Sequence, residues 1–480
     1  MSKDVVRGTL LGTVGQAWHL ITAFLLYAFL ARRFGPSLFG EWRLVLTVLA
    51  WFEIFVTAGL VKVATKEISE RRAESAGIRR AAYVGQTLLS LAVFAAVEAV
   101  AGIIAGVLRD PAIGQLIRIA ALDIPLFGLF MVASSEVLGE QRFERQAVAV
   151  IVYATAKAAL ITVLVAVGFS VPGALVGNAV SSLVGFAVVA VRGPRSRESM
   201  KEVMLGAQGL LLAAVPFLVL SLLDNLGQNA DLWLVSAVVA NTTLLGLYAS
   251  AAVIAEVPVF LFLGLNRVVF PAVAKARAEG DLSLAGQHAA LGVRAATIMT
   301  VLGVGLIAGT SRQVLEFVFS TPYEAAALPL MLLMVAASGR AIRATCTEIL
   351  MAEDRRRDAL LNLAATVALE VVAVAVLAGR YGLPGAAAGA AGSALLAAGW
   401  SGFLLRDTLG MLPLVTATRS LISAAVVGVL LTLLSPKASV IPLVLPLASA
   451  VYVVILRLMG ELTSTDIASI RAAIAGGWRG

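Results

Sequence analysis

The sequence predicts an all-α polytopic membrane protein with about 14 transmembrane helices: two six-helix lobes related by an internal parallel repeat, plus two C-terminal helices. Three observations predict this class. Hydrophobic residues make up 60% of the 480 residues and charged residues 14%, whereas a soluble domain carries about 25% charged residues. The apolar runs are continuous over about 20 residues, the length at which a helix crosses a bilayer, and lack the alternation of barrel strands. The chain also repeats part of itself at an offset of 212 residues.

The first predicted span covers residues 8–31, where 24 uncharged residues separate Arg7 from Arg32. Gly35 and Pro36 then form a tight turn. The later spans follow the same pattern of an apolar run between short polar turns, at 44–65, 81–107, 115–139, 147–168, 173–191, 205–230, 244–270, 287–309, 325–350, 359–379, 384–405, 413–434 and 440–458. The turns are short, so no extramembrane domain is predicted.

The positive charges predict the orientation. If the N-terminus lies inside, the interior segments hold 22 of the Lys and Arg residues and the exterior segments hold 8. This positive-inside bias places both termini in the cytoplasm of a multi-pass protein of the cell membrane. The net charge of +8 is explained by these short loops, so no nucleic-acid partner is expected.

The duplication predicts the domain organisation. Residues 170–183 match residues 382–395 in a turn that opens an apolar helix, with Pro172 and Gly173 equivalent to Pro384 and Gly385. Each half has six spans and therefore enters the membrane in the same direction, which predicts two lobes facing each other across a cavity. We predict an N-terminal lobe at 1–200, a C-terminal lobe at 201–410, and two additional helices with a cytoplasmic tail at 411–480.

Charged residues within spans are the candidate functional residues, because each costs about 2.5–3.5 kcal/mol to insert. Arg340 and Arg343 share one face of their span. Two guanidinium groups one turn apart favour a bound anion such as a phosphate. The alternative is a structural ion pair with Glu348 or Asp224.

The span at 205–230 carries a polar stripe of Ser221, Asp224, Gln228 and Asp231 at helical spacing. Such a stripe either lines a cavity or holds helices together. Three further charged residues in the spans are Glu53, Glu256 and Arg267.

Lys157 and Glu370 fall at nearly equivalent positions of the repeat with opposite charge. They form either a pair between the lobes or separate local pairs, and the sequence does not distinguish these.

The sequence contains no recognisable catalytic motif, Gly-rich phosphate loop or metal-ligand cluster. We therefore predict a protein that is not an enzyme and has no cofactor, with H⁺ or Na⁺ coupling left open.

The turn Arg32-Arg33-Phe34-Gly35-Pro36-Ser37-Leu38-Phe39-Gly40 resembles the opening signature of prokaryotic polysaccharide flippases. These belong to the multidrug, oligosaccharidyl-lipid and polysaccharide exporter superfamily. The resemblance continues through the segments 246–252, 267–273, 172–174 and 384–386. The segment Glu256-Val257-Pro258 is similar to a stretch of the lipid II flippases, but Val253 stands where that family has an arginine.

The resemblance implies a flippase that moves a polyprenyl-pyrophosphate-linked oligosaccharide to the outer leaflet by alternating access. Arg340, Arg343 and Arg267 are then expected to bind the substrate. Asp224, Asp231, Glu256 and Glu53 are expected to couple ions or balance charge. Its partners would be the lipid-linked substrate, membrane lipids and other glycan-assembly membrane proteins. The alternatives are a cation-coupled multidrug exporter of the same superfamily and a membrane-embedded glycan polymerase or ligase.

Overall fold

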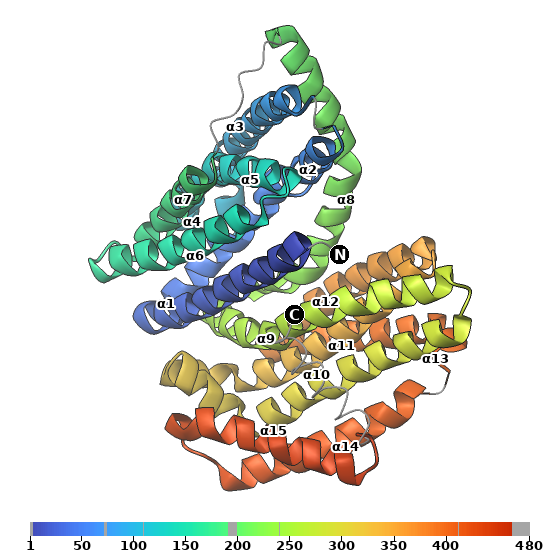
Figure 1. Cartoon of the computed structure of the whole chain (residues 1–480). Helices are drawn as coiled ribbons and strands as arrows, with labels where there is room; N and C mark the ends of the chain where they lie inside the picture. Colours follow the sequence, from blue (N-terminus) through green and yellow to red (C-terminus); the bar gives the residue numbers. More distant parts are fainter. Residues whose placement is uncertain are drawn as a thin grey trace. The chain divides into compact units, whose positions relative to one another are not determined.

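A computed structural model of the protein describes residues 3–71, 74–108, 110–190, 199–239, 241–410 and 412–462. All regular structure in these ranges is helical (Figure 1). The elements are α1 (Lys3–Thr57), α2 (Leu60–Glu70), α3 (Ser75–Val107), α4 (Pro111–Ala121), α5 (Asp123–Gly139), α6 (Phe143–Ala166), α7 (Ser170–Val189), α8 (Met200–Val239), α9 (Thr242–Ala278), α10 (Leu282–Val318), η2 (Thr321–Ala326), α11 (Ala327–Ala352), α12 (Arg356–Leu404), α13 (Arg406–Leu409), α14 (Leu412–Leu434), η3 (Ala438–Val440) and α15 (Ile441–Leu458). Within the described residues, 11 helical segments are long and apolar enough to cross a membrane, which confirms the predicted fold class.

Two of these segments carry two predicted spans each, because a kink divides them. Gly35 interrupts α1 with φ 68°, and Pro36 follows. Gly382 interrupts α12 with φ 63°, and Pro384 lies two residues further. Glycine adopts positive φ without steric cost, and proline lacks the N–H that a continuous helix needs. Both kinks therefore lie where the sequence predicts a turn between spans.

The chain divides into two compact units, Met1–Gly246 and Leu247–Gly480. In the first unit, α8 packs against α1, α2 and α3. The division therefore falls after α8, whereas the sequence predicts a lobe boundary between residues 200 and 201. The assignment of six spans to each lobe stays a prediction.

The duplicated segment packs in the same way in each unit. In the first unit, α6 lies beside α7 (Figure 1), and a Cβ atom on Gly177 would lie 2.9 Å from the side chain of Ile161. In the second unit, a Cβ atom on Gly389 would lie 2.8 Å from the backbone of Ala373. Small residues let helices approach closely in a membrane, where dispersion contacts drive association. The repeated glycines therefore have a packing role in both copies.

A second close contact involves Gly40 and Gly246. A Cβ atom on Gly40 would lie 2.1 Å from the carbonyl oxygen of Thr242, and one on Gly246 would lie 1.8 Å from that of Pro36. The hydroxyl groups of Ser37 and Thr242 are 3.1 Å apart beside this crossing. The second half of α1 thus meets the start of α9 backbone to backbone, which agrees with the predicted helix approach at Gly40.

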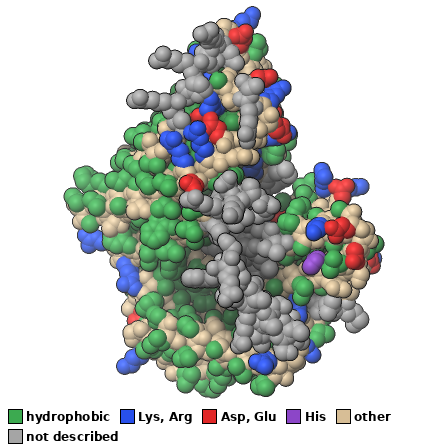
Figure 2. All heavy atoms as spheres, in the orientation of Figure 1, with side chains coloured by type: hydrophobic (Ala, Val, Ile, Leu, Met, Phe, Trp, Pro, Cys, Tyr) green, Lys and Arg blue, Asp and Glu red, His purple; other side chains and the backbone are tan. Residues whose placement is uncertain are grey.

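The outer surface is largely apolar. Figure 2 shows hydrophobic side chains over much of the visible face, with Lys, Arg, Asp and Glu gathered in limited patches. Leu433 and Leu458 are 76% and 81% exposed. Such exposure is unfavourable in water and favourable against lipid tails.

Candidate functional site

The first unit has a junction between two helices within the predicted span 115–139. The helices α4 and α5 are separated at Leu122. Pro125 explains the junction, because it has no N–H to donate to the carbonyl of Ala121, four residues earlier. Leu122 keeps right-handed helical backbone angles, with φ −57° and ψ −23°, so α4 continues into α5 across the junction, and Asp123 lies in the first turn of α5.

Asp123 is the centre of a buried polar cluster. Its side chain is 2% exposed. Ser182 on α7 donates its hydroxyl to Oδ1 at 2.5 Å, and the Asn178 amide donates to Oδ2. Asn178 and Ser182 are four residues apart and lie on one face of α7. Buried polar groups held by several hydrogen bonds take a single geometry, so the carboxyl group of Asp123 is positioned by α7.

Glu53, on the second half of α1, joins this cluster. Its carboxyl group is hydrogen-bonded to that of Asp123. Two carboxylates in contact repel each other unless a proton or a cation is bound between them. The pair is therefore suited to bind and release a cation, and the coupling role of Glu53 stays a prediction.

Lys157 on α6 provides a positive charge near the two carboxyl groups. Its ammonium group lies 5.7 Å from the centre of the Tyr153 ring on the same helix. His19 on α1 stacks on that ring with the ring centres 6.1 Å apart. The cluster formed by Glu53, Asp123 and Lys157 thus combines two acids and one base among membrane-spanning helices.

The second unit holds an ion pair in which an acidic residue, Glu370, stands at nearly the same position of the repeat as Lys157 of the first unit. Arg340 on α11 lies 3.9 Å from the carboxylate of Glu370 on α12. Glu370 is buried, while 20% of the Arg340 side chain is exposed. Glu370 is equivalent to Lys157 in the repeat, so each of the two has charged neighbours within its own unit. Arg340 is thus paired with Glu370. The predicted alternative of an ion pair of the α11 arginines with Glu348 or Asp224 stays a prediction, because the side chain of Asp224 lies outside the described residues.

The other predicted site residues are placed as follows. Arg343 lies on α11, half-buried, one turn from Arg340. Glu256 is half-buried on α9, and Asp231 is buried near the end of α8. The side chains of Arg267 and Asp224 lie outside the described residues. In the first unit, the structure joins Glu53 with Asp123, a residue that was not predicted as part of the site.

Asp123, Asn178 and Ser182 were not predicted as site residues from the sequence. Two signals were available. Asp123 precedes Pro125 within a span, a pattern that predicts an intramembrane helix break. Asn178 and Ser182 have the i, i+4 spacing of one helix face in an otherwise apolar segment.

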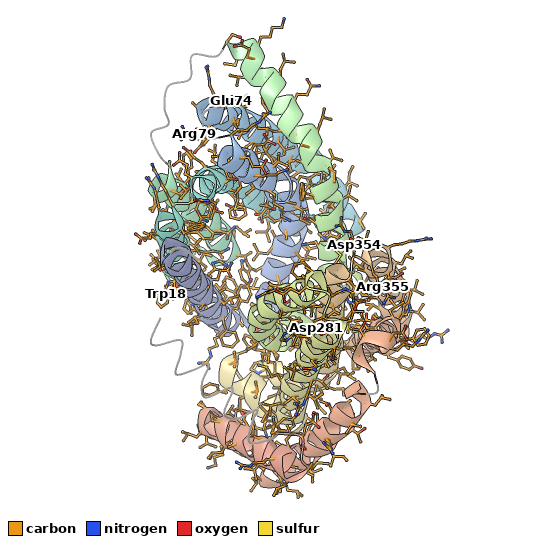
Figure 3. All side chains as sticks on the ribbon, turned by 45° about the vertical axis from the view of Figure 1, so that its right-hand side comes forward. Trp18, Glu74, Arg79, Asp281, Asp354 and Arg355 are labelled. Carbon is orange, nitrogen blue, oxygen red and sulfur yellow. The ribbon has the colours of Figure 1, made fainter. Side chains whose placement is uncertain are left out.

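Charged turns at one end of each unit repeat a three-residue pattern. Glu140-Gln141-Arg142 follows α5, and Glu353-Asp354-Arg355 follows α11 at an offset of 213 residues. The middle residue has φ 60° in both copies. Each glutamate binds the arginine of its own turn, at 3.2 Å in the first copy and 3.6 Å in the second. Figure 3 shows Asp354 and Arg355 together at the turn between α11 and α12.

An arginine from an earlier helix also binds each glutamate. Arg79 on α3 pairs with Glu140 and lies 3.0 Å from the buried Glu136 (Figure 3 labels Arg79). Arg277 at the end of α9 lies 3.0 Å from Glu353. These ion pairs hold each turn against a neighbouring helix, so we assign them a role in stability and not in substrate binding.

Glu461, which follows α15, is the centre of another network. It accepts hydrogen bonds from Thr416 at 2.6 Å, Arg294 at 2.8 Å and Arg419 at 3.0 Å. Burial alone would raise its pKa, but these hydrogen bonds and the nearby Arg294 charge hold the pKa of Glu461 below its usual value. The network fixes the chain after α15 to α10 and α14.

Among the described residues, no group of three or more His, Cys, Asp or Glu side chains has an arrangement that could hold a metal ion.

Helices long and apolar enough to cross a membrane, an internal duplication and charged groups within the spans define a polytopic α-helical membrane protein. The fold is similar to that of the lipid II flippase MurJ in an inward closed conformation, with a TM-score of 0.78 over 94% of this chain and 98% of that chain, at 13% identity. It is also similar to an inward-facing multidrug resistance MATE family transporter of the MOP superfamily, with a TM-score of 0.69 over 81% and 95% of the two chains, at 15% identity. A eukaryotic MATE transporter, AtDTX14, gives a TM-score of 0.58 at 14% identity, over 88% and 100% of the chains.

At the level of sequence, the profile of the family described as "Polysaccharide biosynthesis protein" matches residues 5–277, more than half of the chain. The chain belongs to this family, which confirms the resemblance found in the sequence. No curated protein gives a significant sequence match.

Proposed function

We propose that the protein is a flippase that carries a polyprenyl-pyrophosphate-linked oligosaccharide from the cytoplasmic to the outer leaflet for polysaccharide biosynthesis. The observation that carries the proposal is the family match over residues 5–277. A few charged residues, among them Glu53, Asp123 and Arg340, lie on membrane-spanning helices, which supports a polar path through the protein. The protein acts as a transporter by alternating access and not as an enzyme.

The substrate sets the physical demands on the path. A sugar and a pyrophosphate do not enter the hydrocarbon layer unaided, because every polar group would be left without a hydrogen bond there. The guanidinium group of an arginine can donate two parallel hydrogen bonds to two oxygens of one phosphate. Arg340 and Arg343 lie one turn apart on α11, and Arg340 is bound only loosely to Glu370, at 3.9 Å. These two arginines, together with Arg267, bind the pyrophosphate in the proposed mechanism.

The cluster of Glu53, Asp123 and Lys157 serves as the coupling site in this proposal. The carboxyl groups of Glu53 and Asp123 share a hydrogen bond, and Lys157 already places a positive charge near them. A bound Na⁺ would add a second cation beside Lys157, whereas a proton neutralises one acid. The arrangement therefore favours H⁺ over Na⁺. Asp224, Asp231 and Glu256 then balance the charge of the arginines.

The protein acts in the cell membrane with both termini in the cytoplasm, as the excess of positive charge in the interior segments favours. Its partners are the lipid-linked oligosaccharide, membrane lipids and other membrane proteins of glycan assembly.

A cation-coupled multidrug exporter is the second candidate, because the fold is also similar to that of MATE transporters. Cationic drugs would favour acidic and aromatic walls over the paired arginines of α11. A drug-efflux assay in a sensitised host separates the two functions, and a glycan polymerase or ligase would instead change chain length.

The proposal is tested by deleting the gene in its host and measuring lipid-linked oligosaccharide on each side of the membrane. We expect single lipid-linked units to accumulate inside, and the wild-type gene to restore export. Units that still reach the outer leaflet at the wild-type rate would refute the flippase function.

The arginine roles are tested with Arg343→Gln and Arg340→Gln in the same assay. Because Arg340→Gln leaves Glu370 buried without this partner, the double variant R340Q/E370Q removes the pair together. Arg118→Gln is the matched control, since Arg118 on α4 is half exposed and pairs only loosely with Glu98, at 3.7 Å. We expect the α11 variants to lose export at normal protein levels and the control to keep it. Normal export by Arg343→Gln and by the double variant would remove the assignment.

A further inference from the structure

The first unit contains a polar pocket that the proposed mechanism does not use. It has a volume of about 550 Å³, within the range of small-molecule sites. Its polar wall consists of Asp110, Ser236, Asn241, Thr242 and Thr243. Its floor is apolar and formed by leucine and isoleucine side chains. The pocket lies beside the crossing of Gly40 and Gly246, since Thr242 belongs to both. In the proposed orientation, this end of the helices faces the exterior.

The wall of the pocket is held rigid by helix caps. Asp110 precedes α4 and accepts with Oδ1 from the backbone N–H of Ala112 at 3.0 Å. Asn241 precedes α9 and accepts with Oδ1 from Leu244 N–H at 3.0 Å. Each cap uses one atom of the side chain, which leaves Oδ2 of Asp110 and the Nδ2 donor of Asn241 for a ligand. Side chains fixed in this way lose little entropy when they bind.

Ser236 adds a hydroxyl group to the wall of the pocket. It lies on α8 and lines the pocket while only 7% exposed. Among the described residues its hydroxyl has no hydrogen-bond partner, and the same holds for the Thr243 hydroxyl. Neither hydroxyl belongs to the buried polar atoms without a partner among the described residues, so both are open to the pocket, where a sugar hydroxyl can replace water as their hydrogen-bond partner.

The chemistry of the wall selects the ligand class. Hydroxyl groups, an amide and one carboxylate donate and accept hydrogen bonds in the pattern that sugar hydroxyls need, and the apolar floor suits the C–H face of a pyranose ring. The described side chains that line the pocket carry no positive charge, so the pocket is unsuited to pyrophosphate. It is therefore distinct in chemistry from the arginines of α11.

We propose that this pocket is a glycan-binding subsite, which holds one or two sugar residues of the translocated oligosaccharide on the outer side of the membrane. The inference rests on the proposed flippase function for the identity of the glycan. A subsite at the exit favours the outward-facing state with the sugar bound and so helps to commit the substrate to the outer leaflet.

The test measures glycan binding directly, by saturation-transfer NMR on the purified full chain in lipid nanodiscs. The probe is the soluble oligosaccharide that mild acid releases from the polyprenyl pyrophosphate of the source cells. Thr243→Val removes one hydroxyl that has no internal hydrogen bond. Asn241→Asp keeps a capping oxygen for α9 but removes the amide donor. Thermal unfolding of each variant confirms that it is folded.

Asp281→Asn is the matched control. Asp281 caps α10 through a hydrogen bond from Leu284 N–H at 2.9 Å and does not line the pocket. We expect Thr243→Val and Asn241→Asp to bind the glycan about tenfold more weakly and Asp281→Asn to bind it as the wild type does. No transfer to the wild-type protein, or equal binding by all variants, would overturn the inference. A wild-type protein that binds the free glycan but translocates no lipid-linked substrate would refute the flippase function and leave the subsite standing.

Discussion

Replacing Gly40 by alanine is expected to destabilise the protein through the backbone contact between α1 and α9. The new Cβ atom would lie 2.1 Å from the carbonyl oxygen of Thr242 and 2.8 Å from the backbone nitrogen of Gly246. Carbon and carbonyl oxygen are in contact at about 3.3 Å, so the two backbones must separate by about 1.2 Å. Overpacking of a well-packed contact costs about 1–3 kcal/mol. We expect the upper part of this range, because a carbonyl group cannot rotate away as a side chain can.

The assay is thermal unfolding of the purified protein in one detergent. Gly102→Ala is the control, since Gly102 lies within α3 and no atom would be within 4 Å of its Cβ. Alanine favours a helix over glycine by about 0.5–1 kcal/mol, so this variant should melt at or above the wild-type temperature. Gly40→Ala should melt several degrees lower. If Gly40→Ala and Gly102→Ala melt at the same temperature, the reasoning about the crossing is wrong.

Three further predictions concern strain, charge and pH. Ser170 has φ 49°, and its equivalent in the repeat is Gly382 with φ 63°, so Ser170→Gly should raise the free energy of unfolding by about 1 kcal/mol. Arg79→Met should lower that free energy by about 3–5 kcal/mol, because it leaves Glu136 buried without its cation. Glu461 has a pKa below its usual value, so its contribution to stability is present above about pH 4.3 and is lost as the pH falls through the lower folded pKa. Glu461→Gln should therefore be less stable than the wild type at pH 7, and the difference should shrink in acid.

Chemical denaturation of the same purified variants checks these values. For Ser170→Gly, a lower stability than the wild type would contradict the strain argument. For Arg79→Met, the comparison is Glu98→Gln, whose half-exposed pair with Arg118 at 3.7 Å is worth about 0–1 kcal/mol; equal effects would contradict the burial argument. For Glu461→Gln, a difference from the wild type that persists unchanged at pH 3 would show that the charge is not the cause.

Local pattern predicted most of the fold. The predicted apolar runs are helical, some of them divided between two helices, because a chain in lipid must pair its backbone groups within the segment. The predicted turns at Gly35 and Gly382 are kinks within long helices, since a positive φ followed by proline redirects the chain without a loop. The duplicated segment is explained by the close packing at Gly177 and Gly389.

The candidate site was only partly predictable. Glu53 was identified because a charge within a span is costly wherever it lies. Its partner Asp123 was not identified as part of the site, because 70 residues separate the two in the sequence and only the packing of α5 beside α1 brings their carboxyl groups together. The partner of Arg340 was likewise missed, since it is Glu370 on α12. The sequence suggested Glu348, about two turns along the same helix, or Asp224 instead.

The sequence by itself determined the membrane-spanning class, the order of the spans, the duplication and the set of charged residues that need a partner. These follow from composition and periodicity, which act within one helix. The tertiary structure decided which charges meet: Asp123 with Glu53, and Arg340 with Glu370. The physical reason is that side-chain pairing between helices depends on crossing points and kinks, and these are set by packing across the whole unit.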